Sequence, residues 1–147
     1  MSLLYADTSA VLRAYFVDEP DHVCLAAMLL DGKEAVVTSE LARIELASAI
    51  RGASRAGRLP GWRELLARID ADCGEDGPIT LLALRPDVVL PAAYRLVLEH
   101  RLRTLDAIHV AVAVEECPTL AEGGEVAFVT RDEHQAAAAG ALGLALR

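Results

Sequence analysis

The chain has 147 residues, of which 54% are hydrophobic and 24% charged, and its formal net charge is −8. This length and composition predict one globular domain spanning residues 1–147 and exclude a disordered chain. The negative charge argues against general electrostatic capture of nucleic acid. It suits a basic protein partner, or a cation bound by carboxylates.

Membrane, targeting and disulfide signals are missing from the sequence. Apolar runs end before the ~18 residues that a membrane span requires, and the first residues lack the basic segment and cleavage site of a signal peptide. We therefore expect a cytoplasmic protein with no membrane partner. Scattered cysteines argue against a disulfide framework and against a structural zinc site; they are Cys24, Cys73 and Cys117.

The first half of the chain alternates short apolar strands with helices. Residues 3–6 predict a buried strand, and residues 10–17 and 21–30 predict helices. The β-branched run at residues 35–38 predicts a second strand. Ser39 is expected to cap a long helix that runs to about residue 56 and is ended by Gly57.

The second half repeats this alternation after a break at residues 73–78. Helices are predicted over residues 60–72, 87–101 and 105–114, with Pro91 tolerable only in the first turn of its helix. Weak alternation predicts a strand at residues 79–84, and a clear apolar run predicts one at 126–130. A helix over 132–139, stopped by Gly140, and a short strand at 144–146 complete the chain.

Arginine is concentrated in one segment. Five arginines lie between residues 51 and 68, namely Arg51, Arg55, Arg58, Arg63 and Arg68. This cluster could contact phosphates locally, but we interpret most of its members as a solvated helix face.

The alternation of strands and helices indicates a three-layer α/β/α sandwich with a mostly parallel central sheet. In such folds ligands gather outside the carboxyl ends of the strands. Asp7 and Asp132 follow the two strongest predicted strands. We therefore expect both carboxylates at one edge of the sheet.

Two further acids lie in apolar surroundings. Glu45 shares a predicted helix face with Leu41 and Ala49, and Asp106 begins the apolar run that also contains His109. An ionised carboxylate in such a setting is costly unless it is paired, hydrogen-bonded or bound to a cation.

Each acid also has a structural interpretation. Asp7 and Asp132 could cap the helices that follow them, and Asp106 could do the same unless Thr104 takes that role and leaves Asp106 inside the first turn. Glu45 could pair with a nearby arginine, Arg43 or Arg51. Four acids directed to one sheet edge are better explained as a divalent-cation site, since Mg²⁺ and Mn²⁺ prefer carboxylate and water oxygens. Such a cation activates water and stabilises charge on a phosphodiester.

An ordered set of motifs resembles the PIN domain family, and within it the VapC-type toxins of bacterial toxin–antitoxin pairs. The motifs are Asp7-Thr8-Ser9, Ser39 with Glu45, Thr104-x-Asp106-Ala107-x-His109-x-Ala111, and Thr130-Arg131-Asp132 before Gly140-x-x-Gly143. They cover nearly the whole chain.

The resemblance implies a Mg²⁺- or Mn²⁺-dependent endoribonuclease with Asp7, Glu45, Asp106 and Asp132 as metal ligands. It implies supporting hydroxyls at Ser9 and Thr130, and we expect His109 to pack or hydrogen-bond rather than bind metal. It also implies a homodimer that acts on RNA and is inhibited by a cognate antitoxin covering the cleft.

Two other functions stay open. A PIN-fold binding module would complex antitoxin or RNA without cleaving it, although the complete acid set argues against this. A phosphatase of haloacid-dehalogenase type would use Asp7 as nucleophile, but that chemistry expects a second Asp where Ser9 stands.

Overall fold

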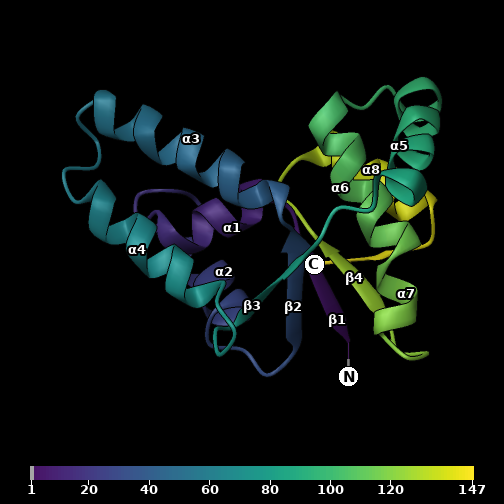
Figure 1. Cartoon of the computed structure of the whole chain (residues 1–147), viewed down its shortest axis with the longest axis horizontal. Helices are drawn as coiled ribbons and strands as arrows, with labels where there is room; N and C mark the ends of the chain where they lie inside the picture. The colour runs from purple at the N-terminus through teal and green to yellow at the C-terminus, as the bar shows by residue number, and fades with distance from the viewer. Residues whose placement is uncertain (1) are drawn as a thin grey trace.

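Five short parallel strands form the central sheet of the computed structural model, which describes residues 2–147 (Figure 1). They are β1 (Leu3–Ala6), β2 (Ala35–Ser39), β3 (Ile79–Leu82), β4 (Val126–Val129) and β5 (Ala145–Leu146). Their spatial order is β3-β2-β1-β4-β5, and every neighbouring pair is parallel. The predicted parallel α/β sandwich is therefore confirmed.

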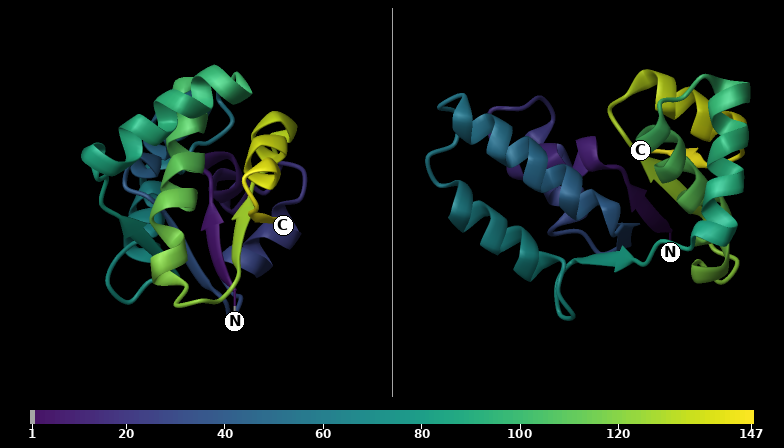
Figure 2. Two further views of the ribbon diagram at one scale, coloured as in Figure 1. Left: turned by 90° about the vertical axis from the view of Figure 1, so that its right-hand side faces the viewer. Right: turned by 45° about the horizontal axis from the view of Figure 1, so that its top comes forward.

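Helices cover both faces of the sheet (Figures 1 and 2). One face packs against α1 (Thr8–Tyr15), α2 (His22–Leu29), α3 (Leu41–Arg55) and α4 (Trp62–Asp72). The other packs against α5 (Pro86–His100), α6 (Thr104–Glu115), α7 (Cys117–Leu120) and α8 (Glu133–Ala141). Right-handed crossovers explain this division, because β1 to β3 advance in one direction across the sheet and β3 to β5 in the opposite direction.

The side chains of β1 alternate between two apolar cores. Leu3 and Tyr5 face α5 and α6, whereas Leu4 and Ala6 face α1 to α4. All four residues are buried, as expected for a strand covered on both faces. This double coverage explains why the strand sequences are continuous apolar runs.

The topology places a ligand site between β1 and β4. The chain leaves β1 toward β2 on one side, whereas β4 lies on its other side, so the direction of winding reverses between these two strands. Parallel sheets bind ligands at such a switch point, outside the carboxyl ends of the strands. Asp7 follows β1 there, and Thr130 follows β4.

Several predicted boundaries are corrected. Helix α1 begins at Thr8 rather than residue 10, because the Asp7 side chain accepts a hydrogen bond of 2.9 Å from the backbone N–H of Ala10. Ser39 ends β2, and Glu40 occupies the N-cap position of α3 without a side-chain cap bond. The Ser39 hydroxyl still accepts a bond of 3.2 Å from Leu41 N–H, so its expected capping role is met in part.

Three predictions about helix ends are wrong. Pro91 lies inside α5, beyond its first turn, because α5 already begins at Pro86. Gly140 does not stop α8, which continues to Ala141 and ends before Gly143, whose φ of 89° suits glycine. Residues 117–120, expected to be non-helical, form the short helix α7.

The three cysteines differ in exposure. Cys117 is buried, Cys73 is partly exposed and Cys24 is exposed, and all three are free thiols. Within residues 2–147 no helix combines the length and the apolar character that crossing a bilayer requires.

Candidate active site

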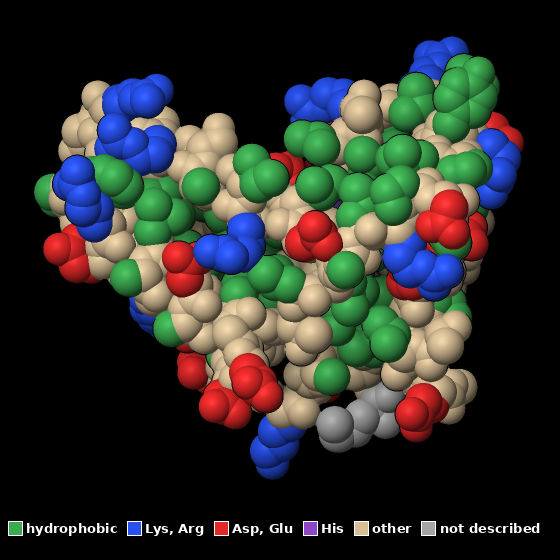
Figure 3. Space-filling view, in the orientation of Figure 1, with side chains coloured by type: hydrophobic (Ala, Val, Ile, Leu, Met, Phe, Trp, Pro, Cys, Tyr) green, Lys and Arg blue, Asp and Glu red, His purple; other side chains and the backbone are tan. Residues whose placement is uncertain are grey.

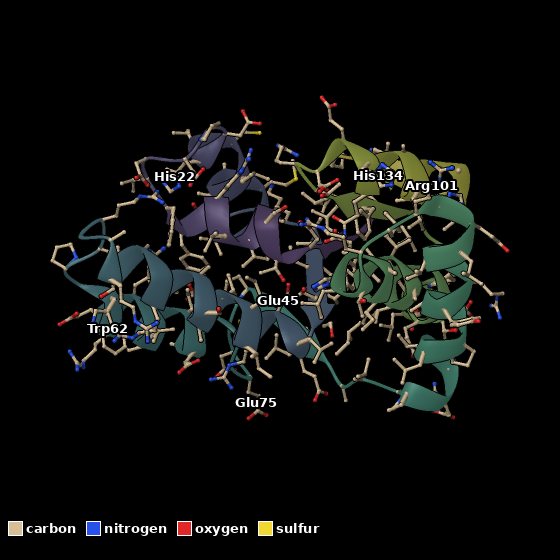
Figure 4. The ribbon with its side chains drawn as sticks, turned by 90° about the horizontal axis from the view of Figure 1, so that it is seen from above. His22, Glu45, Trp62, Glu75, Arg101 and His134 are labelled. Carbon is tan, nitrogen blue, oxygen red and sulfur yellow. The ribbon has the colours of Figure 1, made fainter. Side chains whose placement is uncertain are left out.

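The four acids singled out in the sequence line one cleft at the carboxyl ends of the strands. The cleft has a volume of about 270 Å³ and receives Asp7, Glu45, Asp106 and Asp132 from four different parts of the chain. Figure 3 shows it as the notch between α3 and the α5–α6 side of the molecule. Glu45 lies at the centre of Figure 4, on the side of α3 that faces α6.

Asp7 is the most buried of these carboxylates, with 4% of its surface exposed. Its oxygens lie 2.8 and 3.0 Å from the Ser9 hydroxyl, and the Thr130 hydroxyl is 3.1 Å from Oδ2. Desolvation raises the pKa of Asp7, although the N–H of Ala10 and these hydroxyls oppose the shift. The fold thus holds a desolvated carboxylate at the switch point, where a cation would stabilise its charge.

Glu45 joins a buried hydrogen-bonded chain. Its Oε1 lies 2.6 Å from Nε2 of His109, and Nδ1 of His109 lies 2.7 Å from the hydroxyl of Tyr5. The Tyr5 hydroxyl in turn accepts a bond of 3.2 Å from the backbone N–H of Ser39. A carboxylate oxygen can only accept, so Nε2 of His109 carries a proton. His109 therefore hydrogen-bonds, as expected from the sequence.

The pKa of Glu45 is lowered by this environment. Desolvation is the largest effect and raises the pKa, but the His109 hydrogen bond and charge, together with the hydroxyl of Thr8 at 2.9 Å, outweigh it. Glu45 is therefore held as a carboxylate. Neither arginine considered as its partner contacts it, since Arg43 pairs with Asp70 and Arg51 lies over Trp62.

Asp106 lies inside the first turn of α6 and caps nothing, so its interpretation as an N-cap is wrong. Thr104 does not cap either, because the N-cap position belongs to Arg103. Arg103 Nε donates to Asp106 Oδ2 at 3.2 Å, and its Nη2 lies 4.0 Å from Asp132 Oδ2. Arg103 is thus a cation at the cleft mouth that the sequence reading missed.

Asp132 is a helix cap, as its structural interpretation predicted. Its Oδ1 accepts a bond of 2.9 Å from the backbone N–H of Gln135, which leaves Oδ2 directed toward Arg103. Asp7 caps α1 in the same way. Capping and a place in the cleft are therefore compatible for both acids. Oδ1 serves the helix in each, while Oδ2 of Asp132 faces Arg103 and Oδ2 of Asp7 lies beside the hydroxyls of Ser9 and Thr130.

Gln135 is a supporting residue that the sequence reading missed. It is fully buried, and its Oε1 accepts from the Thr130 hydroxyl at 2.8 Å while its Nε2 donates to the carbonyl oxygen of Asp106 at 3.3 Å. It thereby ties the end of β4 to α6. The Asp132-x-x-Gln135 spacing is similar to a capping box and could have drawn attention to Gln135. In a capping box, however, the Gln side chain hydrogen-bonds to the N-cap backbone N–H, whereas here it bonds to Thr130 and Asp106.

The four carboxylates and the hydroxyls of Thr8 and Ser9 that line the cleft offer only oxygen atoms. Such ligands suit a hard divalent cation. Each carboxylate is meanwhile engaged by donors of the chain itself, such as Ser9, His109 and Arg103. Within residues 2–147 no three His, Cys, Asp or Glu side chains surround a single point.

Comparison with known families identifies the chain. The model of the PIN domain matches residues 4–141. The chain belongs to the PIN domain family. PIN domains are generally nucleases, which hydrolyse phosphodiester bonds, and they typically use divalent metals. A search of curated proteins found no match to this PIN domain.

Proposed function

We propose that this PIN domain is a Mg²⁺- or Mn²⁺-dependent endoribonuclease and the toxin of a toxin–antitoxin pair. The observation that carries the proposal is the cleft itself, which four carboxylates from separate segments line at the switch point of a parallel sheet. A structural role explains Asp7 and Asp132 as caps, but it leaves Asp106 in the first turn of α6, where Arg103 is its only hydrogen-bond partner among residues 2–147. Helix capping therefore accounts for two of the four acids in the cleft and does not account for Asp106.

The proposed ligands are Asp7, Glu45, Asp106 and Asp132. When bound, a divalent cation would supply charge stabilisation for the scissile phosphate and acidify water for attack. Ser9 and Thr130 orient the carboxylate of Asp7, and His109 orients that of Glu45. The protein thus holds two of its four acids in fixed directions before any cation arrives.

An antitoxin partner is supported by the charge of the cleft. Arg103 already places a guanidinium beside Asp106 and near Asp132, which is an example of how an arginine of a partner would be accommodated. A basic antitoxin segment would pair with the same carboxylates and exclude both metal and RNA. The net charge of −8 favours such a basic partner. We propose the cytoplasm as the compartment in which the two proteins meet.

A homodimer is supported by the outer face of α5. Leu90, Tyr94 and Leu98 recur every four residues on this helix and expose 45%, 68% and 66% of their surface. An apolar stripe of this kind is typical of an interaction site. Light scattering should report a dimer for the wild type, and Leu98→Lys should shift it to the monomer; a monomeric wild type would contradict this part of the proposal.

RNA cleavage tests the nuclease. Purified, partner-free protein is incubated with RNA in Mn²⁺, and in EDTA as the control. We expect cleavage in Mn²⁺ and none in EDTA. Cleavage that persists in EDTA would contradict the role of the cation.

One observation favours a second candidate, a binding module that does not cleave. Ser9, His109 and Arg103 already donate hydrogen bonds to three of the acids. Within residues 2–147 no three His, Cys, Asp or Glu side chains surround a single point. Asp7→Asn distinguishes the two candidates. A nuclease loses cleavage with this substitution, whereas a binding module retains RNA or antitoxin binding and never cleaves.

A further inference from the structure

A second chemical feature lies away from the acidic cleft, where α3 and α4 meet. We define the basic tip as Arg51, Arg55, Arg58 and Arg63 together with Trp62, at the end of α3 and the start of α4. Figure 3 shows Lys and Arg side chains gathered over this end of the molecule. The whole chain has only 14 Lys and Arg residues and a net charge of −8, so this local concentration is not explained by composition.

Trp62 orders two of the arginines. The guanidinium carbons of Arg51 and Arg63 lie 4.0 and 4.3 Å from the centre of its ring. The ring itself packs against the core beneath α1 to α4, so it is a fixed support. A guanidinium stacked on an aromatic face keeps its N–H edge free to donate, and stacking reduces the entropy lost when it binds an anion.

Three members of the basic tip have no acidic partner. Arg58 pairs with Asp18 at 2.8 Å and with Glu19 at 3.4 Å, but no carboxylate lies within 4.0 Å of Arg51, Arg55 or Arg63 in the described part of the chain. Their only side-chain hydrogen bond in that part is a long one, 3.3 Å from Arg51 to the Ser54 hydroxyl. The like charges are therefore gathered without internal neutralisation.

The basic tip is connected to the cleft by a single rigid element. Helix α3 carries Glu45, and Arg51 and Arg55 follow six and ten residues later, or about 9 and 15 Å further along the helix axis. Figure 4 shows Glu45 near the middle of the molecule and Trp62 toward one end of it. Arg51 and Arg55 lie about 120° and 80° around the helix axis from Glu45, so a polyanion that reaches both sites has to wind partly around α3.

We propose that the basic tip binds the phosphates of single-stranded RNA and holds the strand that enters the acidic cleft. The inference rests on the proposed function, because it takes RNA as the polyanion. Bidentate guanidinium groups suit phosphates, and a chain of strongly negative charge needs a local positive surface to capture RNA at all. The basic tip is thus a docking site that acts before and apart from cleavage.

Salt-dependent binding tests the basic tip. A short fluorescein-labelled single-stranded RNA is titrated in EDTA, so that cleavage does not enter the measurement. Each phosphate contact contributes about 0.7 to the slope of log affinity against log salt for single strands, so Arg51→Gln/Arg55→Gln/Arg63→Gln should flatten the slope by about 2. Between about 50 and 200 mM salt, wild-type affinity should then fall about 16-fold more than that of the variant.

Two matched variants control this experiment. Lys33→Gln/Arg85→Gln/Arg147→Gln removes the same total charge from positions outside the basic tip and should leave the slope unchanged. Replacing the three tip arginines by lysine keeps the charge, so it should retain most of the slope while weakening the stacked, bidentate contacts. Circular dichroism verifies that each variant is folded.

The outcomes separate this inference from the nuclease proposal. Equal slopes for the tip variant and the surface control would overturn the docking site. A wild-type protein that does not bind RNA would also overturn it, and so would one that binds polyglutamate but not RNA. A flattened slope in a protein that never cleaves RNA would support the docking site and reject the nuclease.

Discussion

His109 on α6 and Glu45 on α3 meet through a hydrogen bond of 2.6 Å across the cleft. The two residues are 64 positions apart, and the bond connects helices that pack on opposite faces of the sheet. Through Tyr5, His109 is also linked to β1, the strand that directly precedes Asp7. One buried side chain therefore fixes the relative positions of two of the proposed metal ligands.

Removing the Tyr5 hydroxyl should weaken the whole fold. Tyr5→Phe leaves the backbone N–H of Ser39 and Nδ1 of His109 without their buried partner, which costs about 1–3 kcal/mol of unfolding free energy. Chemical denaturation measures this loss. In a double-mutant cycle with His109→Ala, the two losses should be less than additive because they break the same chain. Additive losses would contradict the connected network.

Asp7→Asn should stabilise the protein while abolishing its proposed chemistry. Burial raises the pKa of Asp7, so the native state binds its proton more tightly than the unfolded chain, and ionisation destabilises the fold as pH rises through the native pKa. At neutral pH we expect Asp7→Asn to gain about 1 kcal/mol, or about 2–4 °C in Tm. The advantage should shrink in acid. A variant that is less stable than wild type at neutral pH would show that charge–dipole stabilisation outweighs desolvation.

The ion pair of Arg103 predicts competition with cations. Its guanidinium binds Asp106 and lies near Asp132, and its side chain is 84% exposed, so the pair is worth about 0.2–1 kcal/mol. Arg103→Gln should therefore tighten Mn²⁺ binding by a few-fold, measured by calorimetry. Arg101→Gln, an exposed neighbour without an ion pair in residues 2–147, is the control. Weaker Mn²⁺ binding by Arg103→Gln would contradict the competition.

Asp132 allows its capping and catalytic roles to be separated. Asp132→Ala removes the bond to Gln135 N–H and should cost about 1 kcal/mol of stability, whereas Asp132→Ser preserves a capping oxygen. Both variants lack the carboxylate that faces the cleft, so both should lose RNA cleavage. Thermal unfolding and cleavage assays are compared for the pair. Full activity of Asp132→Ser would reduce Asp132 to a cap.

Much of the fold follows from local sequence. The apolar runs that became β1, β2 and β4 are double-sided strands, and the weaker run at residues 79–84 also formed one, β3. Helix ends were less predictable: α5 begins early enough to enclose Pro91, and α8 continues past Gly140 to Ala141. Gly57, by contrast, ends α3 with a φ of 77°, as its residue type predicts.

The acids, the hydroxyls of Ser9 and Thr130 and the hydrogen bonding of His109 were predictable from the sequence, whereas the contacts of Arg103 and Gln135 were not. The parallel topology alone directs Asp7 and Asp132 to one edge, and Glu45 and Asp106 reach the same cleft. The contacts of Glu45 with His109, and of Gln135 with Thr130, join side chains whose meeting depends on the packing of separate elements. The role of the four acids as metal ligands stays a prediction.

Asp106→Asn provides the most direct test of the central claim. Asp106 caps no helix, and within residues 2–147 its side chain hydrogen-bonds only with Arg103, so the amide should leave the fold intact. Wild type and variant are incubated with RNA and Mn²⁺, and unfolding curves verify that their stabilities match. We predict cleavage by the wild type and a loss of at least about 100-fold in the variant, since the substitution removes a charged group from the proposed cation site. Undiminished cleavage by a folded Asp106→Asn protein would contradict the account.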